Sequence, residues 1–343
     1  MTNRLDQILW RFSGMVVSLL GLSVLVFVIS RVLPGNPARM ALGPMASDEQ
    51  VADLAAEMGL NDPIPLQYVD YMRGLFVGDL GQSLQTRNPV VQDILFKLPA
   101  TLELITVATV FMIGLGIPLG VLAARNRGGV IDNATRVFAF STVSVPNFFI
   151  GIVFQVVFGY YLQLFPITGR ISREYGQQVT RETGFLLLDT LLSGALGAHL
   201  NAWAHILLPA LALSFGGTGQ IIRITRSSMI DIDGKEFIKA SQGYGLPDWL
   251  VSYKYTLKNA FIPTFTILGL LYAWLLGGAF IIEIVYSWPG LAKYGVQSVL
   301  TTDVNAIVGV TMVIGLAFVV TNFLVDLVLS RIDPRMQLGG EGI

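Results

Sequence analysis

The sequence contains no cysteine, only two histidines and little charge. Of its 343 residues 13% are Asp, Glu, Lys or Arg, whereas a typical soluble domain carries about 25% charged residues. The lack of Cys excludes disulfide bonds, thiolate metal sites and cysteine nucleophiles, and His199 and His205 leave little material for a histidine metal site. With 53% hydrophobic residues and a mean hydropathy of +0.64, most of the surface must face lipid. The composition predicts an integral membrane protein, and the net charge of −1 shows no bias toward nucleic acid.

Six apolar segments are long enough to cross a bilayer, for which about 20 residues are needed. They are residues 12–30, 100–123, 137–161, 205–222, 260–286 and 306–330. No small-residue cleavage site follows the first, so we expect a retained anchor rather than a signal peptide. Gly116 and Gly120 have the spacing that favours close contact between helices, and Gly277 with Gly278 could pack in the same way. We therefore expect an all-α, polytopic fold with six transmembrane helices.

The distribution of Lys and Arg predicts the orientation. With both termini inside, the inner segments hold 13 of the 22 basic residues in short stretches, and the outer loops hold the rest over much longer ones. Basic residues gather on the cytoplasmic side of membrane proteins, so both termini are expected in the cytoplasm. The expected regions are 1–34 (N-terminal segment and first span), 35–99 (extracytoplasmic subdomain), 100–335 (a core of five spans) and 336–343 (cytoplasmic tail).

Two outer loops are long enough to carry structure of their own. Residues 47–50 (Ser-Asp-Glu-Gln) form a helix-start signature, and the helix should run to Met58 and end at Gly59. This predicts a small helical subdomain within 35–99. In the second loop, residues 185–200 are apolar but too few to span a bilayer, so we expect one interfacial or re-entrant helix there.

The inner loop 223–258 is the most distinctive stretch of the chain. Two helical segments should meet at Gly243 and Gly245, because glycines permit the positive φ that ends a helix, and Pro247 suits a helix start. Basic residues alternate there with Phe237, Tyr244, Leu246 and Trp249. An ordinary cytoplasmic loop explains the charge, but exposed aromatics around a turn favour a docking surface for another protein.

The chain lacks the common motifs of catalysis. It contains no Gly-x-x-x-x-Gly-Lys-Ser/Thr run, which excludes ATP binding through a P-loop, and no His-Glu-x-x-His or Gly-x-Ser-x-Gly element. The acids within spans, Glu103, Glu283 and Asp326, all lie near span ends, where reaching the interface costs little. Intramembrane acids are functional candidates by default, but a secondary transporter would more usually carry an acid at mid-span, and the sequence has none there. A self-sufficient secondary transporter or channel stays the alternative to a subunit that depends on partners.

The inner loop resembles the cytoplasmic signature loop of ABC importer permeases. The resemblance rests on Glu236-Phe-Ile-Lys-Ala-Ser-Gln-Gly-Tyr-Gly-Leu246, followed by Leu257-Lys-Asn-Ala260 and Pro263. It is specific to the first of the two membrane subunits of dipeptide/oligopeptide importers and covers nearly the whole chain. Further similar motifs are Val32-Leu-Pro-Gly-Asn-Pro37, Gly78-Asp-Leu-Gly-Gln-Ser83, Thr101-Leu-Glu103, Ser144-Val-Pro-Asn-Phe148, Leu207-Leu-Pro-Ala210, Tyr286-Ser-Trp-Pro-Gly-Leu291 and Asp333-Pro-Arg335. The chain departs from the general signature where Lys239-Ala-Ser241 replaces Glu-Ala-Ala and Leu257-Lys258 replaces Leu-Pro.

The resemblance implies a function, partners and site residues. It implies the ABC permease fold in a bacterial inner membrane, a second permease with which the chain forms the path, and a binding protein that delivers a dipeptide or oligopeptide from outside. Two cytoplasmic ATPases would bind ATP and Mg²⁺, so this chain would hold no cofactor and would not be an enzyme. Nickel or glutathione, which related importers carry, are the alternative substrates. The residues implied in ATPase coupling are Glu236, Lys239, Ala240, Ser241, Gly243, Gly245, Leu246 and Pro247, and those suggested for the path or its hinges are Pro118, Pro146 and Gly277.

Overall fold

The computed structural model describes residues 4–32, 37–43, 45–57 and 59–332. These residues are almost entirely helical, and their only β-type pairing is an isolated bridge between Gln82 and Pro89. The chain divides into two compact units, Met1–Pro99 with Gly290–Val319, and Ala100–Pro289 with Val320–Ile343. The predicted tail 336–343 and the Asp333-Pro-Arg335 motif lie outside the described residues.

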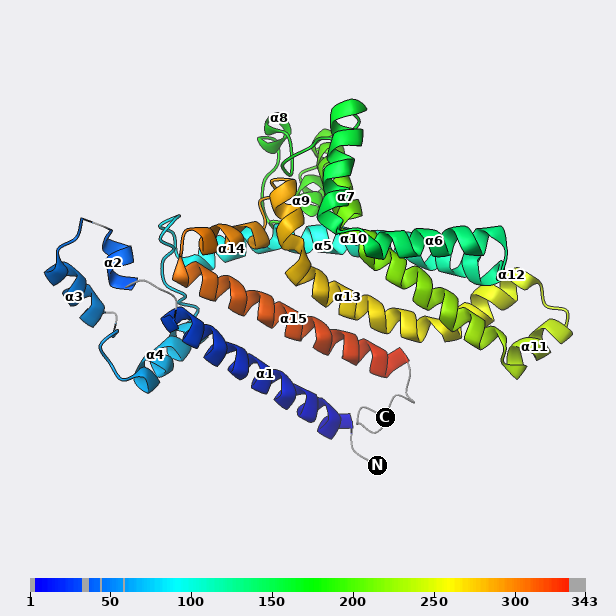
Figure 1. Ribbon diagram of the computed structural model, residues 1–343, viewed down its shortest axis with the longest axis horizontal. Helices are drawn as coiled ribbons and strands as arrows, with labels where there is room; N and C mark the ends of the chain where they lie inside the picture. Colours follow the sequence, from blue (N-terminus) through cyan, green and yellow to red (C-terminus); the bar gives the residue numbers. More distant parts are fainter. Residues whose placement is uncertain (1–3, 33–36, 44, 58, 333–343) are drawn as a thin grey trace. The chain divides into compact units, whose positions relative to one another are not determined.

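The first unit carries the amino-terminal helices and part of the carboxy-terminal ones (Figure 1). It contains α1 (Arg4–Val32), α2 (Pro37–Leu42), α3 (Asp48–Glu57), α4 (Ile64–Val77), the start of α5 (Val90–Arg125), α14 (Leu291–Leu300) and the first part of α15 (Val304–Ile332). The predicted start of α3 is confirmed. Gln50 N–H donates to Ser47 Oγ (3.2 Å) and Ser47 N–H donates to Gln50 Oε1 (3.0 Å), which is the reciprocal capping box.

A buried carboxylate holds the segment 78–89, which connects α4 to α5. Asp303, fully buried, accepts a hydrogen bond from Ser83 Oγ (2.6 Å) and another from Ala306 N–H at the start of α15 (3.2 Å). A carboxylate suits this position because the first amides of a helix lack partners within the helix. The Gly78–Ser83 motif thus ends at Ser83, which donates a hydrogen bond to Asp303, the residue that caps α15.

The second unit is built around one long helix, α10 (Leu196–Asp233). Around it lie α6 (Val130–Ser144), α7 (Asn147–Phe154) with the π-helix η1 (Gln155–Tyr161), α8 (Arg173–Gly176), α9 (Leu186–Leu192) and α13 (Leu257–Val285). Beyond the end of α10 come α11 (Glu236–Gly243), α12 (Asp248–Leu250) and the π-helix η2 (Val251–Thr256).

Glycines bring α5 and α6 close to α10. A Cβ on Gly116 would lie 2.8 Å from Ile221 Cβ, and one on Gly120 would lie 2.7 Å from Thr225 Cβ. A Cβ on Gly219 would lie 2.5 Å from the carbonyl oxygen of Ala139 in α6. The prediction of close packing at Gly116 and Gly120 is therefore confirmed, because no larger residue fits these contacts.

Five helices of the described residues are long and apolar enough to cross a membrane. They comprise Phe12–Arg31, Val90–Arg125, Leu196–Asp233, Asp248–Val285 and Val304–Leu329. The remaining predicted span, 137–161, is bent by 102° between α6 and α7. The bend falls at Val145 (φ −97°, ψ 128°) because the residue before a proline avoids the helical region, and Pro146 then caps α7.

The prediction of one helix over 185–200 is wrong. Helix α9 ends at Leu192, Gly194 adopts a positive φ of 64°, and Leu196 already belongs to α10. The left-handed glycine ends the first helix. The second half of the apolar stretch is thus the beginning of the long helix that contains the predicted span 205–222.

Candidate functional site

The loop after α10 folds as the sequence predicts. Lys235 precedes α11, which ends at Gly243, and Gly245 adopts a positive φ of 76°. Pro247 then caps the start of α12. The two helical segments therefore meet at the glycine turn, and φ at Gly245 is in the region that residues with a Cβ rarely adopt.

This loop exposes a set of aromatic side chains that nothing in the described chain covers. We call them the aromatic surface, and its members are Phe237, Tyr244, Trp249 and Tyr253, which are 46%, 86%, 61% and 46% exposed. Ile238 and Val251 point inward and are buried. Two buried anchors thus hold the loop on the core while four large rings face outward, which is typical of a protein-interaction site.

The predicted coupling residues lie on or beside the aromatic surface. Glu236, Lys239, Ala240, Gly243, Gly245 and Pro247 are exposed, and Ser241 and Leu246 are half-buried. The Ser241 hydroxyl donates to the carbonyl of Phe237 within α11 (2.8 Å). A cleft of about 440 Å³ adjoins this loop and is lined by residues that include Arg125, Arg127, Asp233, Gln242 and Asp248. The loop therefore offers both aromatic and charged groups to a partner.

A partly buried ion pair joins α6 to α10 close to this loop. The Arg226 guanidinium donates from Nε to Asp132 Oδ1 (2.5 Å) and from Nη2 to Oδ2 (2.8 Å), and Gly128 N–H donates to the same carboxylate (2.9 Å). The Asp132 side chain is 1% exposed. Such two-pronged pairs fix direction as well as distance. Sequence reasoning missed this pair, since Arg226 counted only as one basic residue among several.

Pro146 and Gly277 lie in the wall of one pocket, whereas Pro118 does not. The pocket measures about 860 Å³ and lies between the α6–α7 bend, α10 and α13. Pro118 lies exposed within the unbroken helix α5. A Cβ on Gly277 would meet no heavy atom within 4 Å, so the predicted close packing at this glycine is wrong for the described chain.

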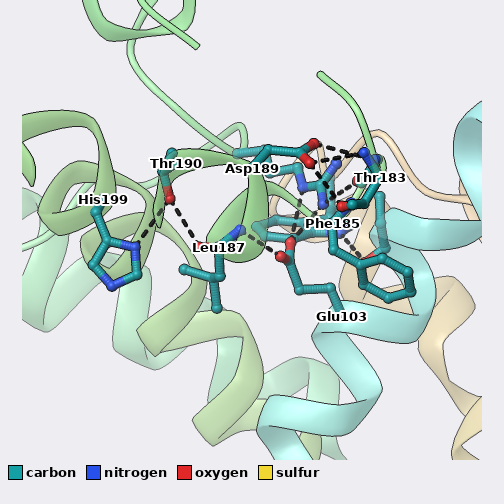
Figure 2. Close-up of polar contacts among 11 residues, drawn as sticks. Glu103, Thr183, Phe185, Leu187, Asp189, Thr190 and His199 are labelled. Carbon is teal, nitrogen blue, oxygen red and sulfur yellow. Dashed lines mark hydrogen bonds and ion pairs between the residues drawn. The ribbon is translucent and has the colours of Figure 1, made fainter. Parts of the chain in front are cut away.

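At the other end of the second unit, a polar network ties a loop to α5 (Figure 2). Glu103 accepts from Arg170 Nη2 (2.6 Å) and Nε (3.1 Å) and from the amide of Leu187 (2.7 Å). Arg170 also donates to the carbonyl of Gly184 (2.8 Å). The Glu103 and Arg170 side chains are 5% and 10% exposed. Every buried charge here has a partner, as burial demands.

Asp189 holds the same loop from the opposite direction. It accepts hydrogen bonds from Thr183 N–H (2.8 Å), Thr183 Oγ1 (2.7 Å) and Gly184 N–H (3.1 Å) (Figure 2). The side chain is 1% exposed. Together the carboxylates of Glu103 on α5 and Asp189 on α9 hold residues 183–187 in place.

The two histidines are engaged in hydrogen bonds. Trp203 Nε1 donates to His199 Nε2 (3.0 Å), so the ring proton lies on Nδ1, 2.9 Å from Thr190 Oγ1 (Figure 2). Thr190 in turn donates to the carbonyl of Leu187 (3.0 Å). The Nδ1 atom of His205 lies 2.8 Å from the carbonyl of Asn201. His199 therefore extends the network from α9 to α10.

The acids near the span ends have partners inside the protein. Glu103 is buried against Arg170, and Glu283 is fully buried and accepts a hydrogen bond from Thr101 Oγ1 (2.5 Å). The partners, Arg170 and Thr101, lie far from these acids in the sequence, and hydropathy alone does not reveal such contacts.

Comparison with known proteins identifies the family. A profile described as "Binding-protein-dependent transport system inner membrane component" matches residues 116–338, and the profile of the N-terminal region of such components matches residues 4–105. The chain belongs to this family of membrane permeases. It is thus a multi-pass membrane protein of the all-helical ABC permease fold.

Relatives in several bacteria match along nearly their whole length. The chain is 39% identical to the probable D,D-dipeptide transport system permease protein DdpB of Escherichia coli K12, over 95% of this chain and 96% of that protein. It is 36% identical to the dipeptide transport system permease protein DppB of Alkalihalophilus pseudofirmus (93% and 95% covered). It is 31% identical to the oligopeptide transport system permease protein AppB of Bacillus subtilis (93% and 95% covered).

The Glu103 network generates a stability prediction. Glu103→Ala leaves Arg170 buried without its carboxylate, and removing one partner of a buried pair typically costs about 3–5 kcal/mol. We expect a clear fall in the thermal unfolding temperature of the purified protein, measured by intrinsic fluorescence in detergent.

Asp70→Ala is the matched control, because Asp70 pairs with Arg73 on an exposed helix face at 3.0 Å. Exposed pairs contribute about 0–1 kcal/mol, so this variant should melt like the wild type. Equal melting temperatures for all three proteins would contradict the role assigned to Glu103.

Proposed function

We propose that this chain is one of two membrane subunits of an ATP-driven importer of dipeptides or oligopeptides. A second permease completes the path, two partner ATPases bind and hydrolyse ATP, and a binding protein delivers the peptide. The family and the printed functions of the relatives support the substrate class. The single observation that carries the need for partners is the uncovered aromatic surface at the end of α10, in a chain without a P-loop.

The proposed orientation puts both termini and the loop 223–258 in the cytoplasm of a bacterial cell and the chain in its inner membrane. The basic residues of that loop support this side, since positive charge favours the cytoplasm. Residues 35–99 and the Glu103 network then lie outside, where the binding protein arrives. In this orientation the aromatic surface faces the compartment that contains ATP.

The proposed coupling runs from α11 into α10. Docked on an ATPase, α11 and its glycine turn move when the ATPase closes, and the pull reaches α10 through only Gly234 and Lys235. Helix α6 follows because Arg226 holds Asp132 and because Gly219 lets the two helices touch. These helices line the pocket of Pro146 and Gly277, so motion at the loop changes its shape.

A mild-detergent purification of the tagged chain from its native membrane, read by mass spectrometry, tests the proposed function. Recovery of a second six-span permease together with one or two P-loop ATPases is the expected result. Recovery of a stable chain alone in good yield would contradict it and would favour a self-sufficient transporter or channel.

The glycine turn generates the second prediction. Gly245→Asp forces a side chain with a Cβ into the left-handed region and adds negative charge beside the aromatic surface. The variant should insert into the membrane at normal levels but lose the ATPases during purification.

Gly78→Asp is the matched control, because Gly78 has the same φ of 76° and open space around its Cβ, outside the loop 223–258. It should retain the ATPases. Loss of the ATPases from both variants would mean that strain, rather than the docking position, causes the effect.

The Asp132–Arg226 pair generates the third prediction. Asp132→Ala releases α6 from α10, so the reconstituted importer should hydrolyse ATP while peptide uptake per ATP falls by roughly fivefold or more, as typical coupling energies imply. The exchanged pair, Asp132→Arg with Arg226→Asp, should recover part of the loss. Arg136→Ala, which removes an exposed charge from the same helix, should match the wild type. An unchanged uptake-to-ATP ratio in Asp132→Ala would overturn this coupling route.

A further inference from the structure

The pocket between the α6–α7 bend, α10 and α13 has a lining without ionisable side chains among the described residues. We call it the neutral pocket. Its volume of about 860 Å³ falls within the range of about 300–1,000 Å³ that small-ligand sites occupy. It lies in a chain with 45 charged residues, 22 basic and 23 acidic. Charge is thus present elsewhere in the protein and missing here.

Two carboxamides supply most of the hydrogen-bonding capacity of the neutral pocket. Asn147 Nδ2 donates to the carbonyl of Leu213 (3.2 Å), which fixes the amide and leaves its Oδ1 as an acceptor near Gly216. Gln220 is half-buried, and its amide has no hydrogen-bond partner among the described residues. A carboxamide offers one acceptor and two donors without charge. This chemistry matches a peptide bond.

One face of α13 forms the apolar wall. Leu270, Trp274, Gly277 and Ile281 follow one another at spacings of four, three and four residues, so they share a helix face. Trp274 is 61% exposed, and Leu270 and Ile281 are each 52% exposed. The gap at Gly277 leaves open space between the larger side chains. A side chain of the substrate could enter at this gap and contact the Trp274 ring.

We propose that the neutral pocket is this subunit's substrate-contacting part of the path. Its wall contacts apolar and aromatic side chains of short peptides, and its lining does not discriminate between charged side chains of either sign. It recognises the peptide through neutral hydrogen bonds to the backbone and through the apolar wall. A fixed charge there would favour entry of peptides of opposite charge and repel those of like charge, whereas a neutral lining lets both pass. The inference rests on the proposed function.

The reciprocal variants Gly277→Glu and Gly277→Lys test this inference in the complete importer, reconstituted in proteoliposomes with its binding protein. The probes are alanyl-glutamate, alanyl-lysine and alanyl-phenylalanine, and the measurement is the initial rate of ATP-driven uptake. Gly277→Glu should lower the ratio of acidic to basic peptide uptake several-fold, and Gly277→Lys should raise it by a similar factor. A charge at a position outside the path would not distinguish peptides in opposite directions.

Val110→Glu and Val110→Lys are the matched controls, since Val110 is 60% exposed on α5 and lies outside the neutral pocket. They should leave the uptake ratio unchanged. Trp274→Ala is a second test that adds no charge to the membrane region. It should lower uptake of alanyl-phenylalanine several-fold relative to the other two peptides.

The outcomes separate the two proposals. A wild-type importer without ATP-driven uptake of any probe would overturn the proposed function and this inference with it. Active wild-type uptake with identical ratios in both Gly277 variants, or with no selective loss in Trp274→Ala, would overturn this inference alone. Opposite shifts in the two Gly277 variants would support it.

Discussion

The close contact of α10 with α5 and α6 is the interaction on which the second unit depends. Within a bilayer, apolar surface gains little by leaving lipid for protein, so helices associate through tight packing and polar contacts. Gly116 and Gly120 let α5 approach α10, and Gly219 lets α10 approach α6. The Asp132–Arg226 pair adds a directional contact at the same interface. One long helix can therefore connect the exposed loop at its carboxyl end with the pocket along its length.

The buried polar groups serve the two ends of this helix differently. Near its carboxyl end a single ion pair joins two helices, close to the segment that exposes its aromatic rings. Near its amino end, Glu103, Asp189 and His199 immobilise a loop through many hydrogen bonds. In the proposed orientation the immobilised end lies outside and the end with the exposed rings faces the proposed ATPases, which suits a protein in which force enters at one face and the cargo enters at the other.

Features that depend on neighbouring residues could be predicted from the sequence, whereas contacts between residues far apart in the chain could not. The turn at 243–247, the capping box at Ser47 and the apolar spans each depend on neighbouring residues. The structure contains the turn, the capping box and five of the six spans as apolar helices of sufficient length. The Asp132–Arg226 pair joins residues 94 apart, and nothing local marks it. For the same reason the burial of Glu103, whose partner Arg170 lies 67 residues away, could not be predicted from its position near a span end. Length and hydropathy likewise could not predict that the apolar stretch 185–200 is divided at Gly194.

The most direct measurement uses the absence of cysteine. Leu270→Cys places a single thiol of this chain in the wall of the neutral pocket, where the native side chain is 52% exposed. A membrane-impermeant thiol reagent would be applied to the importer in nanodiscs, once without nucleotide and once trapped with ATP and vanadate, and labelling of this chain would be read after electrophoresis. If the ATPases reshape the pocket through α11 and α10, the labelling rate differs several-fold between the two states, and Gly245→Asp abolishes the difference. Equal labelling rates in both states of the intact importer would contradict the account.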